Sequence, residues 1–295
     1  MLDRIGLVVH PRRELGRALA TLHAWAAHHG VDVVQVPTPG LERRVAPEGD
    51  AAGCDLVIAL GGDGTALAAL HAAATVGRPV LGVACGSLGA LTAITADRLK
   101  DALAQVAAGD WLPRRLPALV VERDGAEAMA LNDLVLVRAG AGQVMVEVEL
   151  DGERFVRFAG DGLIAGTPLG STAYTLAAGG PMLAPGATGL VLTPLAPHGG
   201  VCPPLVTTPL NRVAITLDPG HSGARMEIDG QVRAELERLR PVTFALRLRD
   251  DFATLVSLDD QEPLVAGLRR RRIIIDSPRV LARDDRRAKD AARSG

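Results

Sequence analysis

The chain has 295 residues and a formal net charge of −2, which is long enough for about two domains of ordinary size. Apolar residues make up 48% and aromatic residues only 2%, so leucine, valine, isoleucine and alanine have to fill the core. A dedicated nucleic-acid binder carries a strongly basic domain with stacking aromatics, and a membrane protein carries an apolar run of about 20 residues. The sequence has neither feature, so we expect no nucleic-acid and no membrane partner.

Cysteine and lysine usage narrows the class of protein further. The cysteines are odd in number and scattered along the chain, at Cys54, Cys85 and Cys202. This pattern favours a reducing compartment, and Met1–Arg4 does not resemble the start of a signal peptide, so we expect a cytoplasmic protein. Lysine occurs only at Lys100 and Lys289, and there is no GxxxxGK[ST] motif. A Walker-type ATPase and a protein kinase with its strand lysine are therefore excluded.

The first third of the chain alternates strand and helix patterns. Strands are predicted at Ile5–Val9, Val31–Val36, Asp55–Leu60 and Val80–Val83, and helices at Leu15–Ala26 with Gly30 as cap, at Ala66–Val76 and at Asp97–Ala108. Several of these strands are apolar on both faces, so helices must cover a parallel sheet on both sides. We expect a Rossmann-like α/β domain at residues 1–113.

The pattern changes after Pro113. Strand-like runs follow at Leu119–Arg123, Leu131–Val137, Val144–Leu150, Phe155–Phe158, Val213–Leu217, Met226–Ile228, Val242–Leu248 and Ala253–Leu258. Asp-Gly pairs at 124–125, 151–152 and 229–230 lie between such runs, which is a strong hairpin signal. These features predict a larger, mainly antiparallel β domain at residues 114–265. Residues 266–295 form a basic extension that we expect to be partly disordered.

Two glycine-rich segments follow strands of the first domain. Gly61–Thr65 reads GGDGT and lies between a buried strand and a helix, where backbone N–H groups can approach an anion. A tight strand-to-helix turn explains the glycines equally well, but Asp63 favours Mg²⁺ binding or deprotonation of a hydroxyl. Gly82–Thr92 follows the next strand. Because both segments end parallel strands, we expect them to face one crevice.

Two further segments lie in the β-rich part. Asn132–Asp133 interrupts an apolar run. An Asx turn explains this pair without function, and recognition of a ribose diol or a purine edge explains it equally well. Gly160–Pro181 packs Gly, Ser and Thr too closely for a regular element and contains the sole tyrosine, Tyr174. Its ring is either core packing or a face for a base or ribose.

Taken together, these segments resemble the NAD kinase family. The signatures of that family are GGDGT, an Asn-Glu pair, GDGLIxSTPTGSTAYxLSAGGP and a late DGQ. This chain carries matching residues in that order, at Gly61–Thr65, Asn132–Asp133, Gly160–Pro181 and Asp229–Gln231, and Thr193–His198 resembles the family's TPxxPH. The similarity covers roughly residues 5–260. GGDGT also occurs in diacylglycerol kinases, sphingosine kinases and phosphofructokinases, whereas the long motif is far more specific.

The resemblance implies transfer of a phosphoryl group from ATP or polyphosphate to the adenosine-ribose 2′-hydroxyl of NAD. Asp63 would be the general base. The dinucleotide would be bound by Asp63, Gly64, Asn132, Asp133, Asp161, Thr172, Ala173, Tyr174, Thr175 and Gln231. Gly61, Gly62, Gly64 and Thr65 would cradle phosphate. Mg²⁺ or another divalent cation would arrive with ATP, and we identify no dedicated protein ligands for it. Family members combine an α/β and a β domain and assemble as homodimers or homotetramers.

The chain departs from the family pattern at several positions. Ala84 and Ala90 replace an Asn and a Phe in the second glycine-rich loop, and Asp133 shortens the family's Glu. Ala68 and Ala159 stand where the family often has a basic residue. Two alternatives therefore stay open, a kinase for another hydroxyl such as a lipid or nucleotide, and a dinucleotide-binding protein without catalysis.

The sequence identifies no partner for three histidines, His71, His198 and His221. We expect them to be hydrogen-bonded or solvent-facing, and we expect no metal site built on them.

Overall fold

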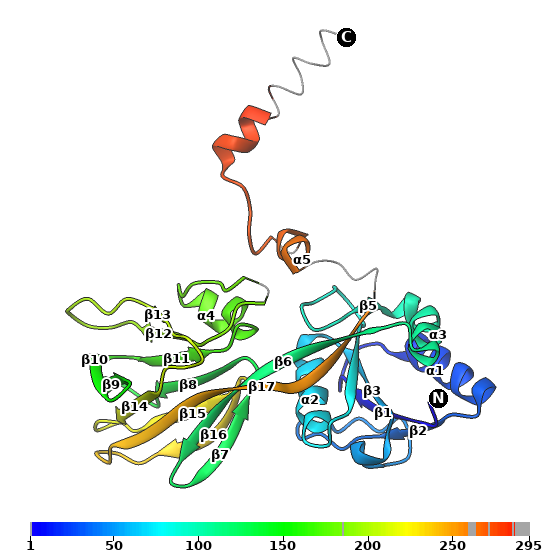
Figure 1. Ribbon diagram of the computed structural model, residues 1–295, viewed down its shortest axis with the longest axis horizontal. Coiled ribbons are helices and arrows are strands. Elements are labelled where there is room, and N and C mark those ends of the chain that lie inside the picture. The colour runs from blue at the N-terminus through cyan, green and yellow to red at the C-terminus, as the bar shows by residue number, and fades with distance from the viewer. Residues whose placement is uncertain (1, 185, 259–263, 271, 285, 287–295) are drawn as a thin grey trace.

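The computed structural model describes residues 2–184, 186–258, 264–270, 272–284 and 286. The N-terminal part contains a parallel sheet with the strand order β4-β3-β1-β2. Its strands are β1 (Arg4–Val9), β2 (Asp32–Gln35), β3 (Leu56–Gly61) and β4 (Pro79–Ala84), with the short β5 (Ile94–Thr95) beside β4. Three helices, α1 (Gly16–His29), α2 (Asp63–Ala74) and α3 (Leu99–Ala108), cover it (Figure 1).

Alternate residues of the strands explain which helix covers which face. Leu7 and Ile58 belong to a core cluster with residues of α1 and α3. Their neighbours Val8 and Val57 belong to a second cluster with residues of α2. Because successive side chains of a strand point to opposite faces, the doubly apolar strands are buried between two helical layers. The predicted parallel sheet is confirmed.

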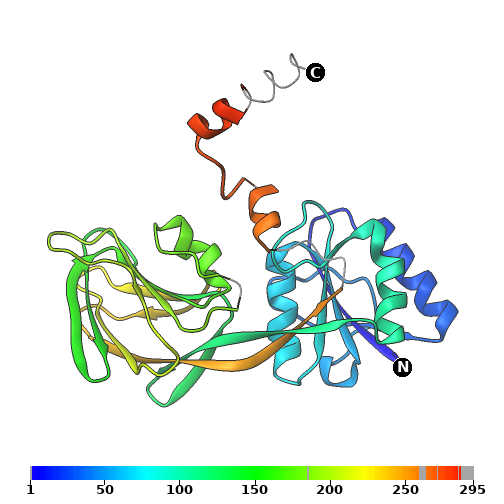
Figure 2. The same ribbon diagram turned by 45° about the horizontal axis from the view of Figure 1, so that its top comes forward.

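Two long strands join the two parts of the molecule. β6 (Leu112–Arg123) and β17 (Val242–Ser257) pair with each other antiparallel. At one end β17 pairs with β14 (Val213–Asp218), and at the other Leu255 pairs in parallel with Val80 of β4. The result is one 11-stranded sheet, and both strands cross from one part to the other in Figure 2. Since β6 runs through residue 113, the division into domains at that residue stays a prediction.

The C-terminal part packs two antiparallel layers against each other. The rest of the first sheet consists of β7 (Ala126–Ala130), β9 (Val144–Leu150) and β10 (Glu153–Gly160). A second sheet has six strands, in the order β13 (Leu205–Val206), β12 (Val191–Leu195), β11 (Gly162–Gly166), β8 (Asp133–Arg138), β15 (Ala224–Ile228) and β16 (Gln231–Leu236). Their inner faces share one core cluster, in which Val146 and Ile215 of the first sheet meet Leu136 and Leu163 of the second. The predicted fold class is thus confirmed.

Short elements complete the chain. Turns of 3-10 helix occupy Ala51–Gly53, Ala96–Arg98 and Gly170–Thr172, and α4 (Tyr174–Ala177) follows the last of them. In the basic extension, α5 (Leu264–Arg270) and residues 278–284 are helical. Residues 271, 285 and 287–295 of this extension, where we also predicted partial disorder, lie outside the described residues. None of the described helices is long and apolar enough to cross a membrane.

Three sequence-based expectations need correction. The segment Gly160–Pro181 contains a regular element, because β11 is a central strand paired with β8 and β12. Its glycines stand where neighbours approach closely, since a Cβ on Gly162 would lie 2.0 Å from the Leu136 carbonyl oxygen. Helix α2 begins at Asp63 and not at Ala66, with Gly62 as its N-cap. The strands β7, β12 and β16 were not predicted.

Candidate functional site

Asp63 lies where the two glycine-rich loops of the N-terminal part meet. It is the first residue of α2, directly after the carboxyl end of β3. Its Oδ2 accepts the backbone N–H of Ala90 at 2.9 Å, and its Oδ1 accepts that of Leu91 at 2.9 Å. The carboxylate is therefore fixed in position by the second loop, as expected for loops that end neighbouring parallel strands.

Glycines around Asp63 are needed for close packing. A Cβ on Gly89 would lie 1.9 Å from Asp63 Oδ1, and one on Gly61 would lie 2.3 Å from Thr65 Oγ1. Gly64 differs, because it is exposed and a Cβ there would meet nothing within 4 Å. The backbone at Gly64 therefore borders open space next to the carboxylate of Asp63, where a ligand can approach it closely.

The Asn132–Asp133 segment is shaped by Asp229. The Asp229 side chain is 4% exposed, and its Oδ1 accepts the N–H groups of Asn132 (2.7 Å) and Asp133 (3.0 Å). Its Oδ2 accepts the N–H of Leu131 at 2.9 Å. These bonds come from a residue 96 positions away along the chain. The side chain that orders the backbone of this segment thus belongs to the β15–β16 turn.

His71 ties Asp229 to the helix that carries Asp63. Its Nε2 lies 2.5 Å from Asp229 Oδ2, and His71 is on α2 two turns after Asp63. The sequence offered no partner for this histidine, because the contact is made across the two parts of the molecule. One helix thus positions Asp63 at its start and supports the Asn132–Asp133 segment from its last turn.

Asp133 has an unusual environment for a carboxyl group. It is 5% exposed, and burial, with smaller contributions from the charges of Asp229 and Glu227, raises its pKa from 3.8 to about 7. A carboxyl group with this pKa is partly protonated near neutral pH. It can therefore donate as well as accept a hydrogen bond there.

The glycine-rich segment after β10 packs directly on Asn132. Thr167 Oγ1 donates to the Leu131 carbonyl at 2.5 Å, and the Thr167 N–H donates to the Asn132 carbonyl at 2.8 Å. A Cβ on Gly170 would lie 1.9 Å from that same Asn132 oxygen. At the start of the segment, Asp161 accepts a hydrogen bond from Arg138 Nε at 2.6 Å. The segment spans β11, so Asp161 beside Arg138 and the residues after Gly170 beside Asn132 lie at opposite ends of that strand.

The remaining residues expected in the site differ in exposure. Thr172 is half-buried, whereas Ala173 and Tyr174 are exposed, Tyr174 at 45%. Gln231 is also exposed and begins β16 next to the Asp229 turn. Thr175 is fully buried, and its Oγ1 faces Gly166 without a hydrogen-bond partner. Tyr174 is therefore available for a base or ribose, whereas the Thr175 side chain packs inward.

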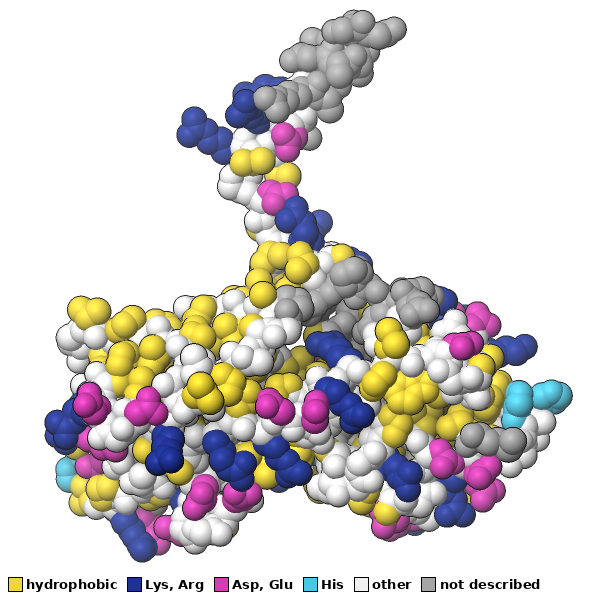
Figure 3. All heavy atoms as spheres, in the orientation of Figure 1, with side chains coloured by type: hydrophobic (Ala, Val, Ile, Leu, Met, Phe, Trp, Pro, Cys, Tyr) yellow, Lys and Arg dark blue, Asp and Glu magenta, His cyan; other side chains and the backbone are white. Residues whose placement is uncertain are grey.

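A cavity of about 460 Å³ lies beside this segment. It is lined by residues of three regions, among them Leu169 and Thr172, Arg114 and Arg115 of β6, and Asp250 of β17. Arg114 Nη1 donates to the Ala90 carbonyl at 3.3 Å, and burial lowers the pKa of Arg114. Figure 3 shows positively charged side chains on this face at the junction of the two parts. Arg114 thus brings a cation to the loop that holds Asp63.

Both parts of the chain match a known protein family. The ATP-NAD kinase N-terminal domain matches residues 6–111, and the ATP-NAD kinase C-terminal domain matches residues 131–245. The chain belongs to the ATP-NAD kinase family. The NAD kinase of Heliobacterium modesticaldum is 38% identical over 206 residues, which cover 68% of this chain and 71% of that one. The family resemblance of the sequence motifs is confirmed.

Two solved structures of ATP-NAD kinase relatives share the fold. Yeast NADH kinase complexed with NADH has a TM-score of 0.73 and 22% identity, over 91% of this chain and 86% of that one. An NAD kinase from Archaeoglobus fulgidus in complex with ATP has a TM-score of 0.72 and 20% identity, over 90% and 98%. The chain therefore shares with them its fold, a mixed sheet with parallel strands in the N-terminal part and an antiparallel sheet in the C-terminal part.

The structure shows what surrounds two positions at which this ATP-NAD kinase family member departs from the family pattern. Ala90 replaces a Phe, yet the contact that holds Asp63 uses the Ala90 backbone N–H, which any residue except proline provides. Ala159 leaves no basic side chain two residues before Asp161, and Arg138 of the neighbouring strand pairs with Asp161 instead. Sequence reasoning missed Arg138, Arg114 and His71, because each reaches its partner from a distant part of the chain.

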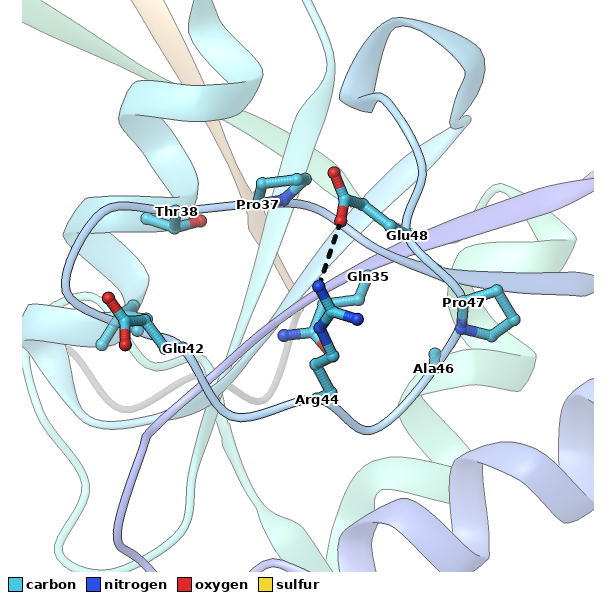
Figure 4. A pocket seen from close by; sticks show the side chains of 9 residues that line it. Gln35, Pro37, Thr38, Glu42, Arg44, Ala46, Pro47 and Glu48 are labelled. Carbon is cyan, nitrogen blue, oxygen red and sulfur yellow. Dashed lines mark ion pairs between the residues drawn. The ribbon is translucent and has the colours of Figure 1, made fainter.

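Other cavities and clusters do not involve the expected site residues. Among the residues that the structure describes, no group of three His, Cys, Asp or Glu side chains could hold a metal ion. A cavity of about 280 Å³ lies inside the loop after β2 (Figure 4). It is spanned by an Arg44–Glu48 ion pair of 4.0 Å, and none of the expected site residues lines it. This loop is nevertheless ordered, because the Gln35 side chain bonds the Arg43 carbonyl and the Val45 N–H.

Proposed function

We propose that the protein is an NAD kinase that transfers the γ-phosphoryl group of ATP, or a phosphoryl group of polyphosphate, to the adenosine-ribose 2′-hydroxyl of NAD. One observation carries this proposal. The Asp63 carboxylate is fixed by two backbone N–H groups between two glycine-rich loops, next to open space at Gly64. Membership of the ATP-NAD kinase family supports the same activity.

In the proposed reaction, Asp63 acts as general base. Its carboxylate takes the proton from the 2′-hydroxyl as that oxygen attacks the γ-phosphorus. A new oxygen–phosphorus bond forms, the bond from the γ-phosphorus to the bridging β–γ oxygen breaks, and ADP leaves with that electron pair. Phosphoryl transfer of this kind depends mostly on positioning and on charge stabilisation. The N–H groups of Ala90 and Leu91 restrict the carboxylate to one orientation, which serves positioning.

Mg²⁺ is proposed to arrive bound to ATP. Mg²⁺ is usually held by substrate phosphates with one or two carboxylates. When bound it would neutralise phosphate charge. Gly61, Gly62, Gly64 and Thr65 are proposed to border the phosphate groups, since they surround the N-terminus of α2.

The dinucleotide is proposed to lie along the edge formed by Asn132–Asp133 and the segment after Gly170. Asn132 and Asp133 would bind ribose hydroxyls or the adenine edge, and the partly protonated Asp133 suits this role because it can donate and accept. The exposed ring of Tyr174 would stack on a base or ribose. The other proposed contacts are Asp161, Thr172, Ala173, Thr175 and Gln231.

The finer properties of the protein are also proposals. We propose a cytoplasmic location, which suits three free cysteines, since thiols persist in a reducing compartment. We propose a homodimer or homotetramer, in which edge strands such as β10 or β13 could pair with a second copy.

The function is tested by mixing the purified protein with Mg²⁺, NAD and either ATP or polyphosphate. NADP is then measured with an NADP-specific dehydrogenase, and NADH replaces NAD in a parallel series. We expect NADP at a rate at least about a hundredfold above an Asp63→Asn control, since general-base catalysis contributes about 10²–10⁴-fold. No NADP above that control with any donor would reject the function. Stabilisation by lipid head groups but not by dinucleotides would favour a lipid kinase.

A further inference from the structure

The strand order places a ligand crevice between β1 and β3. The chain passes from β1 to β2 on one side of β1 and then to β3 on the other side. In open parallel sheets, ligands bind beyond the carboxyl ends of the strands at such a switch point. The loops that border this crevice are residues 10–15 after β1 and the GGDG loop after β3. The β1 loop carries no part of the family motifs found in the sequence.

Arg13 extends from the β1 loop onto the backbone of both glycine-rich loops. Its Nη1 lies 3.4 Å from the Gly61 carbonyl oxygen and 3.4 Å from that of Cys85. A Cβ on Gly62 would lie 3.3 Å from both Nη atoms, and one on Gly86 would lie 2.8 Å from Nη1. Two glycines therefore make room for the Arg13 guanidinium, and a third, Gly89, makes room for Asp63.

The β1 loop holds Arg13 in this position. His10 Nδ1 accepts the backbone N–H groups of Arg12 and Arg13, each at 3.1 Å. Arg43, from the loop shown in Figure 4, donates to the Arg13 carbonyl at 2.6 Å. Burial, followed by the charges of Arg13, Arg12 and Arg43, lowers the pKa of His10, so its ring stays neutral and keeps accepting. Arg12, Arg13 and Arg43 thus all place positive charge at this short loop.

The charge of Arg13 is not compensated by a carboxylate ion pair within the described part of the chain, and its two side-chain bonds go to carbonyl oxygens. The nearby Asp63 carboxylate would repel the phosphates of a donor unless a cation offset it. Ala68, on α2, lacks the basic side chain that the family resemblance implies. A planar guanidinium suits phosphate because it can form two parallel hydrogen bonds.

We propose that Arg13 binds the terminal phosphates of the phosphoryl donor at the switch point, and so supplies the charge that Ala68 lacks. The inference rests on the proposed function, in which the donor is ATP or polyphosphate. Arg13 would neutralise charge on the donor while Asp63 takes the proton of the acceptor. Apart from its 2′-hydroxyl at Asp63, the acceptor dinucleotide is proposed to contact mainly the C-terminal part, so its binding should depend little on Arg13.

The test compares Arg13→Gln, Arg13→Lys and the control Arg17→Gln, which removes an exposed arginine from α1. Initial rates give KM for ATP and for NAD separately. We expect Arg13→Gln to raise KM for ATP at least about tenfold, the loss expected for a hydrogen bond to a charged group, with KM for NAD changed less than twofold. Arg13→Lys should recover part of the loss, and Arg17→Gln should match the wild type.

A binding experiment separates this inference from the proposed function. Inorganic tripolyphosphate is titrated by calorimetry into wild-type protein, Arg13→Gln and Arg17→Gln, after thermal denaturation has shown that each is folded. Weaker binding by Arg13→Gln alone supports the inference, even if no NADP is formed. Equal binding by all three proteins, or an unchanged KM for ATP in an active Arg13→Gln enzyme, overturns it. If Arg13→Gln does not fold, Arg13→Lys replaces it with a smaller expected loss, because lysine keeps the charge but cannot form the paired bonds, and binding and KM for ATP equal to those of the wild type overturn the inference.

Discussion

Asp63 and Asp133 are both acidic residues of the candidate site, but the two parts of the molecule treat them differently. Asp63 is half-buried at the start of α2, and its own oxygens accept two backbone N–H groups. Asp133 is 5% exposed, and the nearby carboxylates of Asp229 and Glu227 act on it together with its burial. At Asp133 the backbone N–H donates a hydrogen bond to Asp229, in the turn between β15 and β16.

This difference shows how one residue type serves two chemical tasks. A carboxylate fixed by N–H donors keeps the orientation that proton abstraction needs. A buried carboxyl group near other acids has a raised pKa, so it takes up and releases a proton near neutral pH. Residue type alone does not distinguish the two. The surroundings decide, and they are assembled from segments far apart in the chain.

The largest effect on activity is expected from a substitution of Asp63. Asp63→Asn keeps the shape but removes the base, so kcat for NADP formation should fall about 10³-fold, within the range for loss of a general base. Steady-state kinetics at saturating ATP and NAD measure this. Asp110→Asn, at an exposed position after α3, serves as control and should keep wild-type kcat. An Asp63→Asn enzyme with more than a tenth of wild-type activity would refute the assigned role.

The second prediction concerns Asp133 and pH. Its folded pKa of about 7 lies above its ordinary value of 3.8, so the folded protein holds a proton that the unfolded chain has lost. The contribution of Asp133 to stability is therefore fully present below about pH 4, falls as pH rises to about 7 and stays level above it. Asp133→Asn removes this dependence. It should match the wild type at pH 4 and exceed it at pH 8 by at most about 4 kcal/mol.

Urea denaturation from pH 4 to pH 8 measures the difference, with Asp110→Asn as the exposed control. A stability difference between wild type and Asp133→Asn that is constant over this range would contradict the raised pKa. NADP formation should be slower in Asp133→Asn even at pH values where this variant is more stable than the wild type. The reason is that the Asn side chain cannot gain or lose a proton.

A third prediction sharpens the role of packing around Asp63. Gly89→Ala places a Cβ 1.9 Å from Asp63 Oδ1, so either the loop or the carboxylate must move. We expect kcat to fall roughly tenfold or more, since small displacements of a reacting group are costly. Gly64→Ala is the matched control for stability, because a Cβ there meets nothing within 4 Å. Thermal denaturation should show Gly64→Ala at least as stable as the wild type and Gly89→Ala less stable.

The smallest effect is expected for the contact between His71 and Asp229, which links the two parts of the molecule. His71→Ala removes one hydrogen bond from the buried Asp229 carboxylate, at a cost of about 1–2 kcal/mol in the free energy of unfolding. KM for NAD should rise as the Asn132–Asp133 segment loosens. His71→Gln, which keeps a donor, should recover part of both losses. His23→Ala, at an exposed position on α1, is the control, and equal effects of the two alanine variants would disprove the link.

The alternation of strands and helices in the N-terminal part could be predicted from the sequence alone. Apolar runs such as Leu56–Leu60 are readable because strands buried on both faces contain almost only apolar residues, and Gly30 caps α1 in the left-handed conformation as predicted. The position of Asp63 between a strand and a helix was also predicted, since it depends on neighbours in the chain. Strand β11 was missed, because glycines at its ends disguise a paired strand.

The groups that surround Asp63 and Asp133 could be identified from the tertiary structure alone. Leu91 lies 28 residues from Asp63, Asp229 lies 96 from Asp133, and His71 lies 158 from Asp229. Local pattern describes which residues share a helix or strand face, but hydrogen bonds of this span depend on how sheets and helices pack. For this reason the motifs could be found in the sequence, whereas the raised pKa of Asp133 and the position of Arg13 became clear from the fold.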